Sequence, residues 1–392
     1  MSLTEKITFC IPTKNRPEFL SRLLNYYAIT SFDGWIFIGD SSEGKYLENN
    51  KVTVEEFQGQ LMIRHFILPS RRVNAVLEKL CVSIKTPFCL GLTDDDFVIT
   101  SSIEKCIEFL EKNSEYVAVH GRGAIIGLDQ RGAYGNINYI NSYPQAIIEA
   151  DTGAGRLKEY LNPPRAEAYS VHRTEVWANM FTGFSEYDWA QNQKITIDEL
   201  ICCGIAAIRG KIKELDCLYL VRQGGHDFQV KRVDFYDLIT HPLWSISIQD
   251  MYNRFTEELV IQDNVDTVEA QALIKEAFFP HFVREFNQLN RMIKSKEKII
   301  IQKGSMIKKV FSFFKRYKKL LPDINFLRNV LFRIFFKTKK IFCLQARQLR
   351  NLGNYYKTRK ADEISLAAIK QTSSTFYEDF KPIFLTCKGE YV

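Results

Sequence analysis

The stretch FCLGLTDDD, residues 88–96, decides the fold of this 392-residue chain. An apolar run of this kind is typical of a strand that is buried on both faces of a sheet, and the three aspartates mark its end. Apolar runs alternate with segments of helical spacing before it: runs at residues 7–11, 35–38 and 61–68, and helical segments at residues 17–28 and 73–84. This alternation predicts an α/β fold with a mostly parallel sheet and helices on both of its faces.

Polar turns follow three of these runs. They lie at residues 12–16, 39–42 and 93–96. Ligands of parallel α/β sheets bind beyond the carboxyl ends of the strands. We therefore expect the three turns to line one crevice.

The rest of the chain is less regular. A helix is expected at about residues 102–111, with Ser101 or Ser102 as its cap. Further expected elements are short strands at residues 116–120, 168–172 and 217–221, a helix at residues 196–209, and helices from His226 to the end.

Composition excludes several classes of protein. With 46% hydrophobic and 25% charged residues, the chain is neither disordered nor fibrous. The N-terminus does not resemble a signal peptide, and there is no apolar run long enough to span a bilayer. Nine scattered cysteines without a C-x-x-C pair argue against disulfides and zinc, so we expect a cytoplasmic protein.

Charge is unevenly distributed. Residues 291–360 hold 21 Lys and Arg against two acids, whereas residues 1–290 hold 29 against 39. Within residues 307–340, apolar residues recur at steps of three and four between the cations, which predicts helices lying on an anionic membrane surface. The alternative is that these apolar faces pack on the body of the protein. No nucleic-acid-binding module accompanies the charge, so we do not expect a nucleic acid as partner.

The aspartate triplet is the strongest chemical signal. Three consecutive carboxylates repel one another, and a hard divalent cation, Mn²⁺ or Mg²⁺, compensates them well because it prefers carboxylate oxygens. The competing interpretation is an acidic helix start that the helix dipole stabilises.

The order of these features resembles that of the GT-A glycosyltransferases, family 2 type, which use nucleotide-sugars. The resemblance covers roughly the first 230 residues. It implies a Rossmann-like GT-A domain in two halves, residues 1–116 for the nucleotide-sugar and residues 117–235 for the acceptor and the catalytic base, followed by a helical, basic region at residues 236–392. The donor-binding residues that it implies are Pro12, Thr13, Arg16, Asp40 and Asp94, and the metal-binding ones are Asp95 and Asp96. We add Arg71, with its neighbour Arg72, as a candidate phosphate contact.

A second signature lies further along the chain. Asp198 and Glu199 open a helix that precedes the strand ending at Arg222, which is similar to the family's acidic pair, in reversed order. The pair supplies the expected catalytic residues, and we favour Glu199 as the general base. His226, after two glycines, is a candidate metal ligand.

The resemblance implies an inverting transfer of a sugar from a UDP- or dTDP-type donor to a polysaccharide or lipid-linked glycan, assisted by metal, and the basic tail suggests that it takes place on the inner face of the membrane. The acceptor site is expected within residues 117–195. Two alternatives remain open. One is a nucleotidyltransferase or another metal-dependent phosphoryl-transfer enzyme, and the other is a non-catalytic module that binds a sugar or nucleotide.

Overall fold

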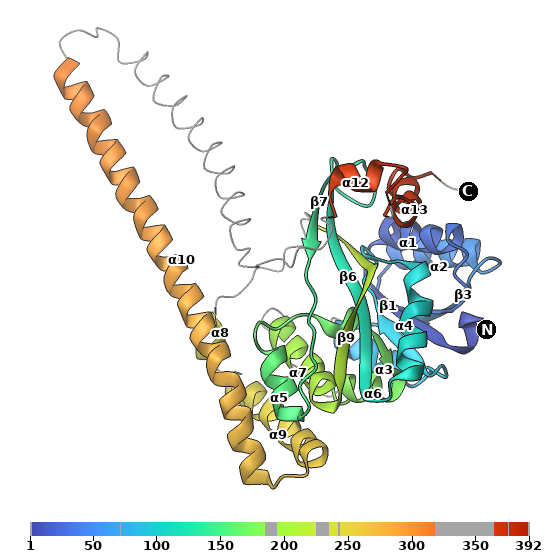
Figure 1. The fold of residues 1–392 in the computed structure, drawn as a ribbon. Helices are drawn as coiled ribbons and strands as arrows, with labels where there is room; N and C mark the ends of the chain where they lie inside the picture. The colour runs from blue at the N-terminus through green and yellow to red at the C-terminus, as the bar shows by residue number, and fades with distance from the viewer. Residues whose placement is uncertain are drawn as a thin grey trace. The chain divides into compact units, whose positions relative to one another are not determined.

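A computed structural model describes residues 2–70, 72–184, 194–224, 235–241, 244–317, 364–374 and 376–390 (Figure 1). The chain divides into two compact units. One comprises Met1–Phe286 together with Ile364–Val392, and the other is Asn287–Glu363. All the residues discussed below as a site belong to the first unit.

The described residues form a nine-stranded mixed sheet. Its strand order is β3-β2-β1-β4-β8-β6-β9-β5, and β7 pairs with β6. The strands β1 to β4 run parallel to one another, as do β6 and β9, whereas β5, β7 and β8 pair antiparallel. Their bounds are β1 (Ile7–Thr13), β2 (Trp35–Asp40), β3 (Met62–Ile67), β4 (Phe88–Gly91), β5 (Phe97–Val98), β6 (Tyr116–Leu128), β7 (Ile137–Tyr143), β8 (Val171–Arg173) and β9 (Lys211–Gln223).

Helices cover both faces of this sheet, which confirms the predicted fold class (Figure 1). On one face lie α1 (Pro17–Ile29), α2 (Lys45–Phe57), α4 (Thr100–Lys112), α12 (Leu366–Lys370) and α13 (Tyr377–Cys387). On the other lie α3 (Val73–Cys81), α5 (Gly153–Tyr160), α6 (Thr174–Phe181), α7 (Lys194–Arg209), α9 (Trp244–Asp263) and the start of α10 (Thr267–Tyr317). The short helix α8 (Phe235–Thr240) precedes α9.

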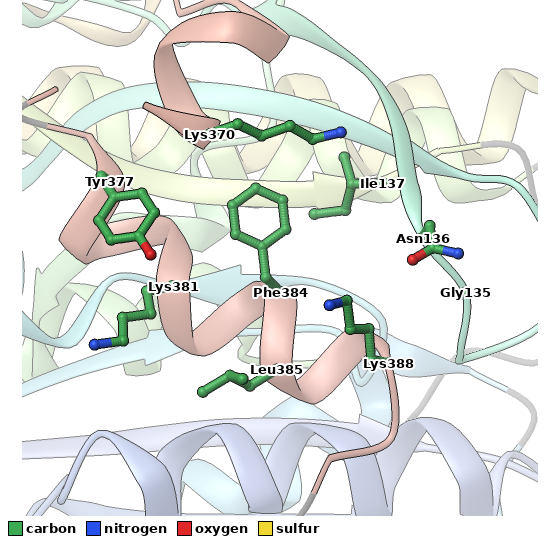
Figure 2. A pocket seen from close by; sticks show the side chains of 9 residues that line it. All are labelled: Gly135, Asn136, Ile137, Lys370, Tyr377, Lys381, Phe384, Leu385 and Lys388. Carbon is green, nitrogen blue, oxygen red and sulfur yellow. The ribbon is translucent and has the colours of Figure 1, made fainter. Parts of the chain in front are cut away.

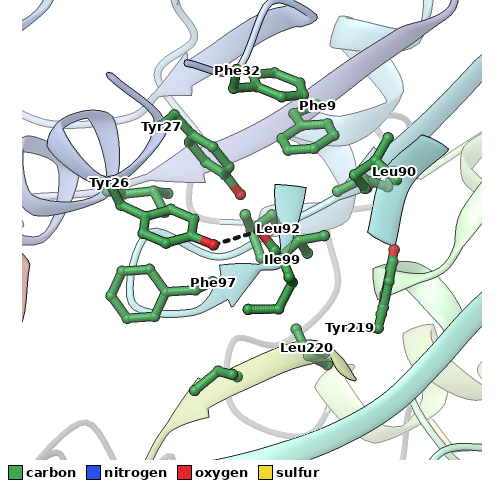
Figure 3. Close-up of a cluster of buried hydrophobic side chains, with 14 of the residues drawn as sticks. Phe9, Tyr26, Tyr27, Phe32, Leu90, Leu92, Phe97, Ile99, Tyr219 and Leu220 are labelled. Carbon is green, nitrogen blue, oxygen red and sulfur yellow. Dashed lines mark hydrogen bonds between the residues drawn. The ribbon is translucent and has the colours of Figure 1, made fainter. Parts of the chain in front are cut away.

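The alternation of side chains along β1 explains why helices cover both faces of the sheet. Phe9 and Ile11 belong to the hydrophobic cluster under α1, while Cys10 belongs to the cluster on the opposite face. Successive side chains of a strand point to opposite faces, so a strand that is apolar throughout needs helices on both sides. Figure 3 shows the first cluster, where the rings of Phe9 and Phe32 stack with centroids 4.3 Å apart.

The register of the parallel strands brings the carboxyl ends of β1, β2 and β4 to one edge of the sheet. Thr13, the last residue of β1, lies opposite Asp40, the last residue of β2. On the other side of β1, Cys10 lies opposite Gly91, where β4 ends. The turns after these strands therefore begin next to one another.

Three expectations about elements were wrong. Neither Ser101 nor Ser102 caps the helix that follows β5: α4 starts at Thr100, and the Ser102 hydroxyl donates to the carbonyl of Leu218. The strands β6 and β9 are each much longer than expected, and β7 was not expected at all. The glycines of β6 concealed the full length of that strand, yet they are required there, because a Cβ at Gly123 would lie 2.5 Å from the carbonyl oxygen of Tyr143 on β7.

The C-terminal region is only partly described. Of the basic segment 307–340, the structure describes residues 307–317, which continue α10; the others lie outside the described residues. No helix within the described ranges combines the length and the apolar character needed to cross a membrane.

Gly39 offers a test of the packing beneath the strand ends. A methyl group at this position would overlap the Cγ1 of Val76 on α3. We expect Gly39→Ala to lower the free energy of unfolding by about 1–3 kcal/mol because of overpacking. Urea denaturation would measure this loss.

Two further variants control the result. Val76→Ala in the Gly39→Ala background removes the overlapping methyl groups, so the double variant should lose less than the sum of the two single losses. Gly59→Ala should be nearly neutral, because nothing lies within 4 Å of a Cβ there. Additive losses in the double variant would contradict the proposed overlap.

Candidate functional site

The turn at residues 94–96 meets the end of β1 and the start of α1. The Thr13 hydroxyl donates to Asp94 Oδ2 at 2.7 Å. The Arg16 guanidinium lies between two of the aspartates, with Nη1 3.2 Å from Asp94 Oδ1 and Nη2 2.8 Å from Asp95 Oδ2. Two carboxylates thus face one cationic group.

The loop that carries Arg16 is shaped by its neighbours. Asn15 has φ of 55°, a left-handed conformation that asparagine tolerates better than most residues. Its backbone N–H donates to Ser42 Oγ at 2.7 Å, and its side-chain oxygen accepts from the Glu43 N–H at 3.0 Å. Pro17 then occupies the first turn of α1, where a missing N–H costs nothing.

Asp40 organises the adjacent loop. The carboxylate is fully buried and accepts hydrogen bonds from the Ser42 N–H at 2.8 Å and the Asn50 amide at 2.9 Å, and it lies 3.0 Å from His65 Nε2. Burial raises the pKa of Asp40, but hydrogen bonds from His65, Ser42 and Asn50 outweigh it and lower the pKa overall. The donor-binding role expected of Asp40 stays a prediction, while its structural role is to hold the loop after β2.

Asp96 has protein partners at both oxygens. Its Oδ1 accepts from the Gln223 N–H at 3.0 Å. Its Oδ2 accepts from Arg222 Nε at 2.9 Å and from the Thr93 hydroxyl at 2.8 Å. The side chain of Asp96 is 1% exposed, and through these hydrogen bonds it holds the turn to the end of β9.

Arg222 is itself held by aromatic rings. Its guanidinium carbon lies 4.9 Å from the ring centroid of Tyr143 and 4.8 Å from that of Tyr169. The Tyr143 hydroxyl also accepts from Arg222 Nη1 at 2.9 Å. Cation–π contacts of this kind favour arginine, whose planar group stacks and donates hydrogen bonds at once.

Arg22 is a residue of the site that was not predicted. It is fully buried on α1 and donates to the backbone oxygens of Asp95 and Ala133, at 2.9 and 2.5 Å, and to the side chain of Gln223. One arginine thereby joins α1, the aspartate turn, the loop before β7 and the end of β9. The signal in the sequence was an arginine on the otherwise apolar face that includes Phe19 and Leu23.

The acidic pair does not open α7 as expected but lies in its second turn, because the helix begins at Lys194, and its two members have different environments. Asp198 is 7% exposed, and its Oδ2 forms an ion pair with Arg72 Nη2 at 3.2 Å. Glu199 is exposed to solvent. Burial raises the pKa of Tyr143, Arg222 opposes this rise, and the charges of Asp96 and Glu199 add to it.

Burial also affects the aspartates. It raises the pKa of Asp94 to about 7, with Asp95 adding to the effect and Arg16 and Thr13 opposing it. Burial works against the charge of Arg16 as well, but Asp94 and Asp95 outweigh it and raise the pKa of the guanidinium. The aspartates therefore keep Arg16 in its charged form, whereas Asp94 takes up a proton more readily than an ordinary aspartate.

Two residues of this turn could contribute carboxylate oxygens to a divalent cation. Within the described ranges, no group of three His, Cys, Asp or Glu side chains could hold a metal ion. Asp94 and Asp95, however, direct oxygens at one cationic group, and Mg²⁺ typically uses one or two carboxylates together with water and phosphate oxygens. Asp96 fits less well, because Arg222, Gln223 and Thr93 all donate to its oxygens, whereas Asp94 is held by Arg16 and Thr13.

The remaining candidates have these positions. Pro12 lies in β1 opposite Gly39 of β2, next to the turn that carries Arg16. Arg71 and His226 lie outside the described residues. The structure thus brings together Thr13, Arg16, Asp94, Asp95 and Asp96, with Asp40 in the adjoining loop.

Comparisons with known proteins complete the description. The chain matches no protein-family model and no curated protein. Among solved structures, the crystal structure of S. aureus TarS 1–349 is similar with a TM-score of 0.45 and 14% identity, over 71% of this chain and 72% of that one. The same protein in complex with UDP-GlcNAc gives 0.46 and 15% over 71% and 73%, and in complex with UDP 0.44 and 15% over 71% and 72%. These values are too low to transfer a property of TarS to this chain.

The ion pair between Arg222 and Asp96 should contribute measurably to the free energy of unfolding. Arg222→Met leaves a buried carboxylate without its counter-ion, so the free energy of unfolding should fall by about 3–5 kcal/mol. Asp96→Asn in the same background should recover part of the loss, because a neutral amide removes the unpaired charge. Chemical denaturation at neutral pH would measure both effects.

The control is an exposed ion pair. Lys112 and Glu108 lie 3.7 Å apart with side chains 74% and 66% exposed, so Lys112→Met should change stability by less than about 1 kcal/mol. If Arg222→Met were as mild as this control, the pair would not hold the turn in place.

Proposed function

We propose that this chain is a glycosyltransferase, which moves a sugar with inversion from a UDP- or dTDP-type nucleotide-sugar to a polysaccharide or lipid-linked glycan. The observation that carries the proposal is the convergence of Asp94 and Asp95 on Arg16, at the carboxyl ends of neighbouring parallel strands. Sheets of this type bind their ligands at that edge. The order of these turns along the chain, which resembles that of the GT-A enzymes, points to the same class.

The diphosphate of the donor would be received at this turn. Arginine recognises phosphate through two parallel hydrogen bonds, and Arg16 presents its guanidinium beside Asp94 and Asp95. These two aspartates would hold Mn²⁺ or Mg²⁺, which supplies neutralisation of the charge that develops on the leaving diphosphate. Arg22, bonded to the Asp95 carbonyl, would keep the turn in position.

Glu199 is the residue that we propose as general base. In an inverting transfer the acceptor oxygen attacks the anomeric carbon, the bond to the diphosphate breaks, and the electron pair leaves with the nucleoside diphosphate. The hydroxyl proton must pass to a base. An exposed carboxylate can reach an acceptor, and Glu199 is exposed whereas Asp198 is buried.

The tail adds a proposed location. The cationic, amphipathic sequence at residues 307–340 would attract an anionic membrane surface, where a lipid-linked acceptor resides. This places the enzyme at the inner face of a membrane as a peripheral protein.

Glu199 and Asp198 can be separated experimentally. Glu199→Gln should lower kcat by about 10²–10⁴-fold with little change in the KM for the donor, because only proton transfer is affected. Asp198→Asn should instead lower stability, since it weakens the pair with Arg72. Steady-state kinetics and thermal denaturation of both variants give the comparison; full turnover by Glu199→Gln would exclude it as the base.

The function itself is tested by product analysis. Incubated with a panel of nucleotide-sugars and Mn²⁺, the full chain should release the nucleoside diphosphate from at least one donor, and Asp95→Asn should reduce this release at least about tenfold. Lys158→Gln, an exposed change far from the turn in sequence, serves as the control. Release of pyrophosphate would indicate a nucleotidyltransferase, and binding without release would indicate a non-catalytic module.

A further inference from the structure

A cavity of about 420 Å³ lies between the C-terminal helices and the loop that leads into β7 (Figure 2). It belongs entirely to the first compact unit, since residues 364–392 are part of that unit. The residues that line it are Gly135, Asn136, Ile137, Lys370, Tyr377, Lys381, Phe384, Leu385 and Lys388.

One face of α13 forms a wall of the cavity. Its lining residues recur at steps of three and four: Tyr377, Lys381, Phe384, Leu385 and Lys388. The opposite face is anchored in the core, because Phe380 and Ile383 are fully buried and Cys387 is 1% exposed. Because these side chains are buried, the rotation of α13 about its axis is fixed. The other face of the helix is therefore held toward the cavity.

Positive charge is concentrated in this cavity. Residues 364–390 contain three lysines and three acids, yet all three lysines and none of the acids line it. Among the described residues, Lys370 and Lys381 have no acidic partner within 4.0 Å, and Lys388 lies 3.8 Å from Glu390 with both side chains about half exposed. An exposed pair at that distance contributes little, so the described residues compensate the charge of the three lysines only weakly.

The floor of the cavity is apolar. Figure 2 shows the ring of Phe384 between the side chains of Lys370 and Lys388, with Ile137 facing it from the opposite wall. A site lined by apolar groups with a few charged ones at its edge suits a small ligand that carries an anionic group, and its volume is within the usual range of such sites.

The opposite wall of the cavity, the loop that leads into β7, is connected by hydrogen bonds to the turn at residues 94–96. The Gly135 N–H donates to the Cys387 carbonyl of α13 at 2.7 Å. In the same loop, the carbonyl of Ala133 accepts from Arg22 and that of Gly132 accepts from Gln223 Nε2 at 2.9 Å. The cavity is therefore built on a loop that the core arginine already holds, which gives it a defined shape.

We propose that this cavity binds a phosphate-bearing molecule, with the phosphate among Lys370, Lys381 and Lys388 and the attached apolar part against Phe384. Lysine binds phosphate as a compact point charge with three donors, and three ammonium groups around one cavity favour a group that carries more than one negative charge. The Tyr377 hydroxyl adds a neutral donor. The phosphate can belong to a soluble ester or to a lipid headgroup. The inference does not depend on the proposed glycosyl transfer.

The test uses the full chain and two triple variants. Lys370→Gln/Lys381→Gln/Lys388→Gln removes the charge of the cavity. Lys85→Gln/Lys112→Gln/Lys158→Gln removes the same net charge from exposed positions elsewhere and serves as the matched control. Equal melting temperatures for both variants establish that they fold.

Binding is measured with two probes. Glycerol 3-phosphate is titrated by calorimetry, with glycerol as the neutral reference, and co-sedimentation is measured with vesicles of phosphatidylcholine with and without phosphatidic acid. The proposal expects the cavity variant to lose at least about tenfold in affinity for one of the probes while the control stays within about twofold. A loss with the soluble ester identifies a soluble ligand, and a loss confined to the vesicles identifies a lipid.

A second variant checks the apolar floor. Phe384→Ala should weaken the binding of a phosphate ester with an apolar tail, such as hexyl phosphate, more than that of glycerol 3-phosphate. Equal effects of the two triple variants, or no binding of either probe by the unaltered chain, would overturn the proposal.

Discussion

Compensation of three adjacent carboxylates, of which Asp94 and Asp96 are buried, is the constraint on which the arrangement of this molecule depends. Asp94 and Asp96 are nearly inaccessible to water, and such groups destabilise a fold unless opposite charges or hydrogen bonds reach them. The chain supplies those partners from distant segments: Arg16 at the start of α1 and Arg222 at the end of β9. The segment that follows the first strand, β1, and the end of the last strand, β9, are thereby both bonded to this one turn. The site therefore forms only when both strands are in place.

The fold provides these partners through its layers. Apolar strands that need cover on both faces bring α1 beside β4, and the long β9 brings Arg222 to the same edge. Arg22 then extends the network to the loop before β7, and this loop bonds to α13. The C-terminal helices are thus part of the body that carries the site, although residues 287–363 separate them from it in sequence.

The sequence predicted the parts of the site that depend on local pattern. Apolar runs ending in polar turns were sufficient to locate β1, β2 and β4 and to anticipate that residues 12–16 and 93–96 meet. It did not predict the length of β6, because glycines that make room for neighbouring strands interrupt the apolar pattern. It did not predict β7 either, because Ile137 is the only buried residue of that strand and its sequence is largely polar. Nor did it distinguish the three aspartates, since their different partners, Arg16 for two and Arg222 for the third, come from segments whose approach is a property of the tertiary structure.

The central claim is that Asp94, Asp95 and Arg16 receive a diphosphate, and the contribution of the diphosphate can be measured directly. Calorimetric titration of the full chain with UDP and with uridine, in the presence of Mn²⁺, isolates that contribution as the ratio of the two affinities. We predict that UDP binds at least about 100-fold more tightly than uridine, and that Asp95→Asn reduces this ratio to about tenfold or less. Equal affinities for UDP and uridine, or a ratio that Asp95→Asn leaves unchanged, would contradict the account.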